Sequence, residues 1–443
     1  MFETDSLKAL TQATELLSQG FDSLPSIEPP GLDNKAAAIL DDVALRMQDN
    51  YPYGHPLYAG QMLKPPHPIA RAAYSLAMQI NPNNHALDGG RASSTLEKEA
   101  VANLASMFGW NAHIGHLCGG GTMANMEALW IAKQEKGGAV VASEQAHYTH
   151  SRLTEVLNIP FYSVAVDHNA QMDISALEAL LKEQQIGTVV VTLGTTGVGS
   201  VDPLHKVLEL QKSYSFRIHV DAAYGGYHGL LTTLADNASQ AFARIAEVDS
   251  IVIDPHKHGL QPYGCGCVLF RDPQIGRHYK HDSPYTYFSS NELHLGEISL
   301  ECSRPGASAT ALWATQQLLP MEAGGEFASG LELGRNAAQA LYQLVCDDDS
   351  QLAIFEPELD IVLWAPKADK ASEISAMSAR EFEQCAAKNL HLALVTLPSK
   401  LLQAHWPTVE FDTDTVTCMR SCLMKPEHAD WVEKIWAIYK KVG

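Results

Sequence analysis

Two ionisable residues in the middle of the chain lie at, or just beyond, the ends of apolar, strand-like runs. Asp221 ends the run that starts at Arg217, and Lys257 follows the run 250–254. A carboxylate or an ammonium at the end of a buried strand is costly unless it is paired or used chemically. Pyridoxal phosphate uses both, a lysine for a Schiff base and an acid that keeps its ring nitrogen protonated. The pair therefore indicates a cofactor site, unless Asp221 only caps a turn and Lys257 only reaches solvent.

A glycine-rich segment provides a possible phosphate site. Gly119 to Thr122 open a helical pattern that continues to Lys136. Glycines let backbone amides approach a phosphate, and a helix N-terminus adds free N–H donors and a favourable dipole. Two alternatives are a simple connecting turn and a dinucleotide fingerprint from Gly119 to Ala124, with Glu144 as the ribose-binding acid. The dinucleotide alternative gives no role to the lysine and the aspartate.

The elements that must position these residues form an α/β pattern. Apolar runs at 139–142, 188–193, 217–220, 250–254 and 266–270 alternate with helical stretches. These runs lack polar alternation, which is typical of strands covered on both faces, so a mostly parallel sheet is expected. In such sheets ligands bind beyond the carboxyl ends of the strands. His147 follows the first run, where an imidazole could stack on a cofactor ring and exchange protons with a substrate, although a lone histidine is more often an ordinary loop residue.

The length of the chain and its pattern of apolar residues predict three structural parts. The 443 residues, 46% of them hydrophobic, exceed the size usual for one domain. Residues 1–92 hold one helix, near 34–47, and a Pro/Tyr-rich stretch; residues 93–320 form the large α/β domain. Residues 321–443 form a small α+β domain. Its expected elements are a helix at 326–344, a strand at 361–364, a helix at 378–388, a strand at 415–419 and a closing helix from 427.

Composition argues against several function classes. The formal net charge of −20 comes with no basic stretch, so neither a nucleic acid nor an anionic membrane is an expected partner. The acidic N-terminus does not resemble a signal peptide and no apolar run reaches membrane-spanning length, so a cytoplasmic protein is expected. The eight cysteines lack the paired spacing of a zinc site and are expected to be buried, reduced thiols, so no metal site is predicted.

Five segments, in this order, resemble the signature of the group II pyridoxal-phosphate-dependent amino-acid decarboxylases. This family includes the glutamate, cysteine sulfinate and aromatic amino-acid decarboxylases. The resemblance covers most of the chain, from about His55 to the C-terminal helix. The five segments are 119–125, 143–147, 193–196, 219–226 and 254–257.

The resemblance implies the aspartate-aminotransferase-like architecture, fold type I, and a homodimer with active sites at the subunit interface. It implies that Lys257 holds the cofactor covalently, that Asp221 contacts the ring nitrogen, and that His147 stacks on one face of the ring. The remaining cofactor contacts that it implies are Ala223 on the other ring face, Gly121, Thr122 and His256 at the phosphate, and Thr196 near a ring substituent.

Two further segments resemble the substrate side of glutamate and cysteine sulfinate decarboxylases. The segment 55–61 ends in Gln61, and the segment 419–426 contains Arg420, which would bind a substrate carboxylate through its planar fork. An acidic or small polar amino acid is therefore the favoured substrate, with an aromatic one second. The alternative for Arg420 is an ion pair at the protein surface.

The sequence also departs from the family. His258 stands where aromatic amino-acid decarboxylases usually carry tryptophan, and the segment 279–295 is short for their catalytic loop. Tyr285 and Tyr287 in that segment are candidate proton donors, unless they pack at the dimer interface and His147 takes this role. The segment 303–306 resembles both archaeal tyrosine/aspartate decarboxylases and sphingosine phosphate lyases. A carbon–carbon lyase is therefore the first alternative to decarboxylation. A nicotinamide-dependent oxidoreductase, based on the segment 119–124, and a non-catalytic binding protein are the other two.

Overall fold

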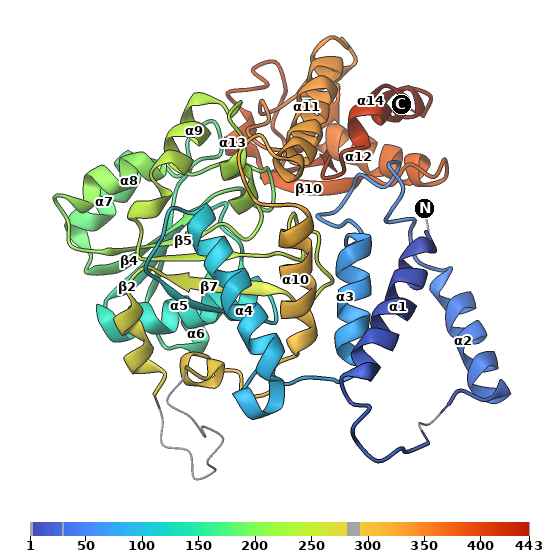
Figure 1. Cartoon of the computed structure of the whole chain (residues 1–443). Coiled ribbons are helices and arrows are strands. Elements are labelled where there is room, and N and C mark those ends of the chain that lie inside the picture. The colour runs from blue at the N-terminus through green and yellow to red at the C-terminus, as the bar shows by residue number, and fades with distance from the viewer. Residues whose placement is uncertain (1–2, 29–30, 281–292, 443) are drawn as a thin grey trace.

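The computed structural model describes residues 3–28, 31–280 and 293–442. The candidate proton donors Tyr285 and Tyr287 lie outside these residues. Two sheets with their helices make up the body of the molecule, and three N-terminal helices stand along one side of it (Figure 1). None of the helices in the described ranges combines the length and the apolar character that crossing a bilayer would need.

The larger sheet has seven strands in the order β1-β7-β6-β5-β4-β2-β3. The strands β6, β5, β4, β2 and β3 pair in parallel, whereas β7 is antiparallel to both β6 and β1. This confirms the expected mostly parallel sheet, with the run 266–270 as its antiparallel member. The strands are β1 (Ile114–Cys118), β2 (Ala139–Ser143), β3 (Phe161–Val164), β4 (Ile186–Thr192), β5 (Arg217–Asp221), β6 (Ser250–Ile253) and β7 (Gly266–Phe270).

Both faces of this sheet are covered, which explains why its strands are continuously apolar. Val189 and Val191 of β4 pack into one hydrophobic cluster together with α4 and α10, whereas Val190 between them packs into another with α5. A strand with one exposed face would alternate apolar and polar residues, whereas β4 is covered on both faces and is apolar throughout its centre. The helices of this part are α4 (Leu87–Met107), α5 (Gly121–Glu135), α6 (Thr149–Val156), α7 (Ile174–Glu183), α8 (Leu204–Gln211), α9 (Asp236–Ala243) and α10 (Gly306–Leu318).

Strand directions bring five chain segments to one edge of the large sheet. Since β1 is antiparallel to β7 and β7 is antiparallel to β6, β1 runs in the same direction as the parallel group. The carboxyl ends of β1, β2, β4, β5 and β6 therefore lie at the same edge. Every predicted cofactor residue follows or ends one of these five strands.

The smaller sheet is antiparallel throughout, in the order β10-β11-β9-β8. The predicted C-terminal elements are confirmed, although the helix expected at 378–388 begins seven residues earlier and the strand expected at 415–419 continues through Arg420. The elements are α11 (Glu326–Cys346), β8 (Gln351–Ala353), β9 (Ile361–Pro366), α12 (Ala371–Ala386), β10 (Ala393–Pro398), α13 (Ser399–Leu402), β11 (Thr415–Cys422) and α14 (His428–Tyr439).

The prediction of a single helix in the first ninety residues is wrong. The structure has α1 (Asp5–Gln19), α2 (Asn34–Met47) and α3 (Pro68–Met78) before α4 begins. The predicted helix is confirmed as α2. The start of α3 is hidden in the sequence because it lies in a run of prolines, yet proline fits the first turn of a helix, where its missing N–H has no intrahelical partner.

Candidate active site

The strand ends enclose a cavity of about 360 Å³. The lining combines glycines from the start of α5, carboxylates, imidazoles and one lysine, all from the edge where the five strands end. All eight predicted cofactor residues are among its lining residues: Gly121, Thr122, His147, Thr196, Asp221, Ala223, His256 and Lys257.

Lys257 follows β6 by a short turn and is held by a buried carboxylate. Its Nζ lies 3.1 Å from Asp254 Oδ2, and Asp254 is buried while Lys257 stays partly exposed in the cavity. The other oxygen of Asp254 has no hydrogen-bond partner within the described residues. The amine is thus placed in the cavity rather than in bulk solvent.

Asp221 lies at the end of β5, and its two oxygens have different partners. Oδ1 accepts a hydrogen bond from the Ala223 amide at 3.1 Å, which is the turn-capping contact considered above. Oδ2 accepts from His150 Nε2 at 2.9 Å and from Asn125 Nδ2 at 3.3 Å. Burial alone would raise the pKa of Asp221, but the hydrogen bond and charge of His150, with the charge of Lys257, hold it well below its usual value. Asp221 is therefore an anion in the cavity wall.

Backbone N–H groups at the start of α5 face the same cavity. Gly120 caps this 15-residue helix with φ 144°, and no side chain caps it. A side chain at Gly121 would put its Cβ 2.7 Å from Asp254 Oδ2, so this position has room only for glycine. The first N–H groups of a helix have no intrahelical acceptor and favour an anion. His256 lies beside this turn, with its Nδ1 2.9 Å from the Cys265 carbonyl oxygen.

His147 and Thr196 complete the cofactor residues expected from sequence. His147 is half-buried, its Nδ1 accepts a hydrogen bond from the Thr149 amide at 3.2 Å, and burial lowers its pKa below the usual value. The imidazole is therefore neutral at neutral pH, which suits contact with an aromatic ring. Thr196 lines the cavity after β4, and its carbonyl oxygen accepts a hydrogen bond from Arg420 Nη2 at 2.8 Å.

Arg420 and Gln61 come from distant parts of the chain and meet next to Thr196. The Nη1 group of Arg420 lies 3.5 Å from Gln61 Oε1 and 3.4 Å from the Gly60 carbonyl oxygen, and its Nε donates to the Gly197 carbonyl at 3.1 Å. Arg420 is only 5% exposed and makes no ion pair with a carboxylate among the described residues. The alternative of an ion pair at the surface is therefore wrong.

The cavity fits pyridoxal phosphate. The start of α5 offers N–H donors to a phosphate, Asp221 offers an anion to a pyridine nitrogen, and Lys257 offers a primary amine to an aldehyde. Thr192 Oγ1, which belongs to another lining residue, is buried without a hydrogen-bond partner in the described chain. The donors and acceptors that this cofactor needs are thus present in one place.

Comparison with known proteins decides the family. Residues 30–365 match the model described as the pyridoxal-dependent decarboxylase conserved domain. The chain belongs to this family. It is therefore an enzyme, a decarboxylase, and pyridoxal phosphate is its cofactor.

Curated relatives of this decarboxylase include enzymes named for two different amino acids. It is 25% identical to the L-tyrosine decarboxylase of Enterococcus faecium over 449 residues, covering 77% of this chain and 74% of the relative. It is 28% identical to the L-aspartate decarboxylase of Thermococcus kodakarensis over 345 residues, covering 76% of this chain and 86% of the relative.

Solved structures confirm the predicted fold. Mouse CSAD superposes with a TM-score of 0.79 at 19% identity, covering 99% of both chains. The tryptophan decarboxylase of Catharanthus roseus, solved in complex with L-tryptophan, gives a TM-score of 0.73 at 15% identity, covering 100% of this chain and 99% of that one. The decarboxylase therefore has the fold type I architecture expected from sequence.

The alternatives to decarboxylation are not favoured, and for the oxidoreductase there is a structural reason. Glu144, which would bind a ribose, lies 3.0 Å from Lys400 Nζ and is not part of the cavity lining. The strand before the glycines, β1, is an edge strand that pairs only with the antiparallel β7, within the described sheet. A dinucleotide fingerprint instead follows a strand of a parallel βαβ unit.

Sequence reasoning missed several residues of the decarboxylase site. His150 and Asn125 hold Asp221, and Asp254 holds Lys257. Asp254 could have been found, since it ends an apolar run just as Asp221 does. His150 and Asn125 lie on helices, and nothing in their spacing along the chain connects them with the end of β5.

Proposed function

We propose that this decarboxylase converts an acidic L-amino acid, with L-aspartate as the first candidate, into the corresponding amine and carbon dioxide. A small polar amino acid is included in the favoured class, and an aromatic substrate such as L-tyrosine is the second candidate. Relatives named for aspartate and for tyrosine support both candidates, so the choice between them depends on the residues near the cavity.

Arg420 is the observation that carries the preference for an acidic substrate. Its guanidinium is buried and bonded to the carbonyl groups of Gly60, Thr196 and Gly197, without a carboxylate partner among the described residues. A buried charge that lacks a counter-ion is costly, and a carboxylate on the substrate would supply one. Gln61 adds a polar group at the same place. Gln61 and Arg420 are therefore the proposed substrate-binding residues.

The cofactor contacts expected from the family resemblance become proposals about individual residues. Pyridoxal phosphate, when bound, supplies the electron sink for the bond that breaks. Lys257 would attach it covalently, and Asp221, kept anionic by His150, would hold a proton on the ring nitrogen. The other proposed contacts are Gly121, Thr122 and His256 at the phosphate, His147 and Ala223 at the ring faces, and Thr196 near a ring substituent.

The proton that replaces the lost carboxyl group needs a donor. Tyr285 and Tyr287, outside the described residues, remain the proposed donors. His147 is the alternative, because its imidazole lines the cavity, although burial lowers its pKa. An imidazole can serve as a general acid only in its protonated form, so a lowered pKa makes His147 the weaker acid source at neutral pH.

The proposal includes a homodimer with active sites at the subunit interface, as the family resemblance implies, and helix α2 supports the dimer contact. No residue of α2 is buried, although one face of this helix is apolar. An exposed apolar helix face is normally covered by a partner. Figure 1 shows α2 standing apart from the sheets, beside α1. The exposed apolar residues of α2 are Ile39, Leu40, Val43, Leu45 and Met47.

A cytoplasmic location is part of the proposal. All eight cysteines are free in the described chain, and six of them are buried. Proteins of oxidising compartments usually pair their cysteines, whereas the cytoplasm keeps thiols reduced. Fractionation of cells that produce the protein would test this directly.

A comparison of two substrates tests the proposed specificity. We expect the cofactor-loaded enzyme to release carbon dioxide from L-aspartate with a higher kcat/KM than from L-tyrosine. Arg420→Lys should lower kcat/KM for aspartate by about tenfold or more, because an ammonium cannot reproduce the planar fork. Arg244→Lys, at a surface arginine paired with Glu209 and Glu247, is the matched control and should behave as wild type. A preference for tyrosine that Arg420→Lys leaves unchanged would refute an acidic substrate.

A further inference from the structure

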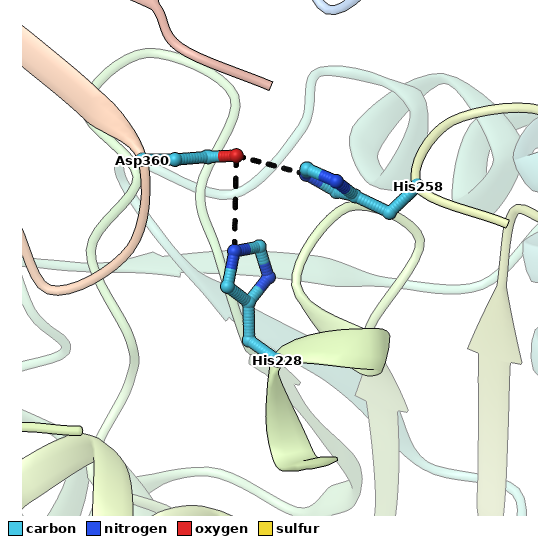
Figure 2. Close-up of side chains that lie close together, drawn as sticks. All are labelled: His228, His258 and Asp360. Atoms are coloured by element: carbon cyan, nitrogen blue, oxygen red, sulfur yellow. Dashed lines mark ion pairs between the residues drawn. The ribbon is translucent and has the colours of Figure 1, made fainter. Parts of the chain in front are cut away.

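Three buried side chains, His228, His258 and Asp360, point toward one another (Figure 2). His228 lies in a short 3₁₀ helix, Gly226–Leu230, after β5. His258 directly follows Lys257, and Asp360 directly precedes β9. His228 is 0% exposed, His258 1% and Asp360 1%. The cluster thus joins the two halves of the molecule, and the proposed decarboxylation gives it no role.

The two imidazoles lack hydrogen-bond partners. Neither ring nitrogen of His228 or of His258 makes a hydrogen bond within the described ranges, 3–28, 31–280 and 293–442. A neutral imidazole has one N–H and one lone pair, and burying both without partners is unfavourable. Asp360 has only these two imidazoles as ion-pair partners in the same part of the chain. The cluster therefore lacks a group that would satisfy the buried nitrogens.

The spacing of the three groups suits a metal ion. Asp360 Oδ2 lies 3.2 Å from His258 Nε2 and 3.7 Å from His228 Nε2. A ligand atom of each residue lies within 4.8 Å of the other two. Zinc binds imidazole nitrogen and carboxylate oxygen at about 2.0–2.2 Å, and the edge of a tetrahedron with such bonds is about 3.3–3.6 Å. The two nitrogen–oxygen distances bracket this edge.

The carboxylate is oriented from its other side. The Tyr224 hydroxyl donates to Asp360 Oδ1 at 2.5 Å, which leaves Oδ2 toward the imidazoles. Ligating carboxylates are commonly held by such a second contact.

We propose that His228, His258 and Asp360 bind a divalent transition-metal ion of the Zn²⁺ class, with water as the fourth ligand. His258 also lines a second cavity, of about 540 Å³, from which an ion can enter. The ion joins the turn after Lys257, the segment after β5 and the start of β9. Its role is structural: it fixes the position of Tyr224, which lines the cofactor cavity, relative to the smaller sheet.

Lys64 is an unfavourable neighbour of such an ion. It lines the same second cavity, and its Nζ donates to the Met424 carbonyl at 3.2 Å. Because its ammonium opposes a second positive charge, Lys64→Met should tighten metal binding several-fold. This effect has the opposite sign to the loss expected from removing a ligand.

Metal content of the cofactor-loaded enzyme tests the proposal without relying on activity. The protein is stripped with a chelator, reloaded with Zn²⁺ or Co²⁺, desalted and analysed by elemental mass spectrometry. We expect one ion per chain, and for Co²⁺ the visible absorption of a tetrahedral site. His228→Gln and Asp360→Asn should each lower retained metal at least tenfold. The matched control His168→Gln, at an exposed histidine, should retain the wild-type amount.

A wild-type chain that retains no stoichiometric ion and gives no tetrahedral Co²⁺ spectrum would overturn the proposal. So would unchanged metal retention in both folded ligand variants. If either variant fails to fold, the wild-type ion count, the Co²⁺ spectrum and the Lys64→Met affinity decide the question. Tighter binding in Lys64→Met supports the site, and unchanged or weaker binding contradicts it.

Discussion

His150 holds Asp221, the aspartate proposed to contact the cofactor ring, in its charged form, so removing His150 should damage catalysis in a specific way. Its Nε2 donates to Asp221 Oδ2 at 2.9 Å in a buried environment. A hydrogen bond to a charged group contributes about 1.5–3 kcal/mol. If this contribution supports the transition state, His150→Leu should lower kcat by about 10- to 150-fold, since 1.4 kcal/mol corresponds to tenfold.

The pH profile distinguishes this role from simple packing. Burial raises the pKa of Asp221 and His150 lowers it, so removing His150 should shift the Asp221 pKa upward. The active form needs the carboxylate, and activity is lost as pH falls through its pKa. The acid limb of the kcat profile should therefore move to higher pH in His150→Leu. His150→Gln retains an N–H donor and should show a smaller shift.

The assay is kcat measured from acid to neutral pH, together with cofactor affinity. His205→Leu, at a half-buried histidine outside the cavity lining, is the control and should keep the wild-type profile. If His150→Leu has an unchanged acid limb and unchanged kcat, His150 does not maintain the charge of Asp221 and the reasoning fails.

Three other predictions concern attachment, stability and assembly. After borohydride treatment, peptide mass spectrometry of Lys257→Ala should find no peptide that carries reduced cofactor. A modified peptide elsewhere in the chain would assign the attachment to another lysine. Arg304→Met should lower the free energy of unfolding in urea by about 3–5 kcal/mol, because it leaves buried Glu97 without its ion-pair partner at 2.7 Å. A loss under 1 kcal/mol would contradict this. The double variant Leu40→Glu/Val43→Glu should be monomeric by light scattering, whereas a dimer of wild-type stability would exclude α2 from the interface.

Sequence reasoning predicted the strand-end residues well because the pattern there is local. A continuous apolar run predicts a covered strand, and the carboxyl ends of parallel strands share one edge. Asp221 and Lys257 could therefore be brought together without knowledge of any contact. The glycines before α5 could be added because a helix start is also a local signal.

The remaining parts of the site depend on contacts that the sequence does not encode locally. His150 reaches Asp221 from the first turn of α6, and Arg420 of the smaller sheet meets Gln61 of the N-terminal segment. The helix that Pro68 starts was not predicted, because prolines precede it and give no helical pattern. Such contacts depend on tertiary packing and not on neighbouring residues in the chain.

Product analysis of the cofactor-loaded enzyme with L-aspartate distinguishes decarboxylation from carbon–carbon cleavage. We expect equimolar carbon dioxide and amine, without aldehyde, and loss of both products in Lys257→Ala. An aldehyde released without carbon dioxide, or equal product formation by wild type and Lys257→Ala, would contradict decarboxylation at this site.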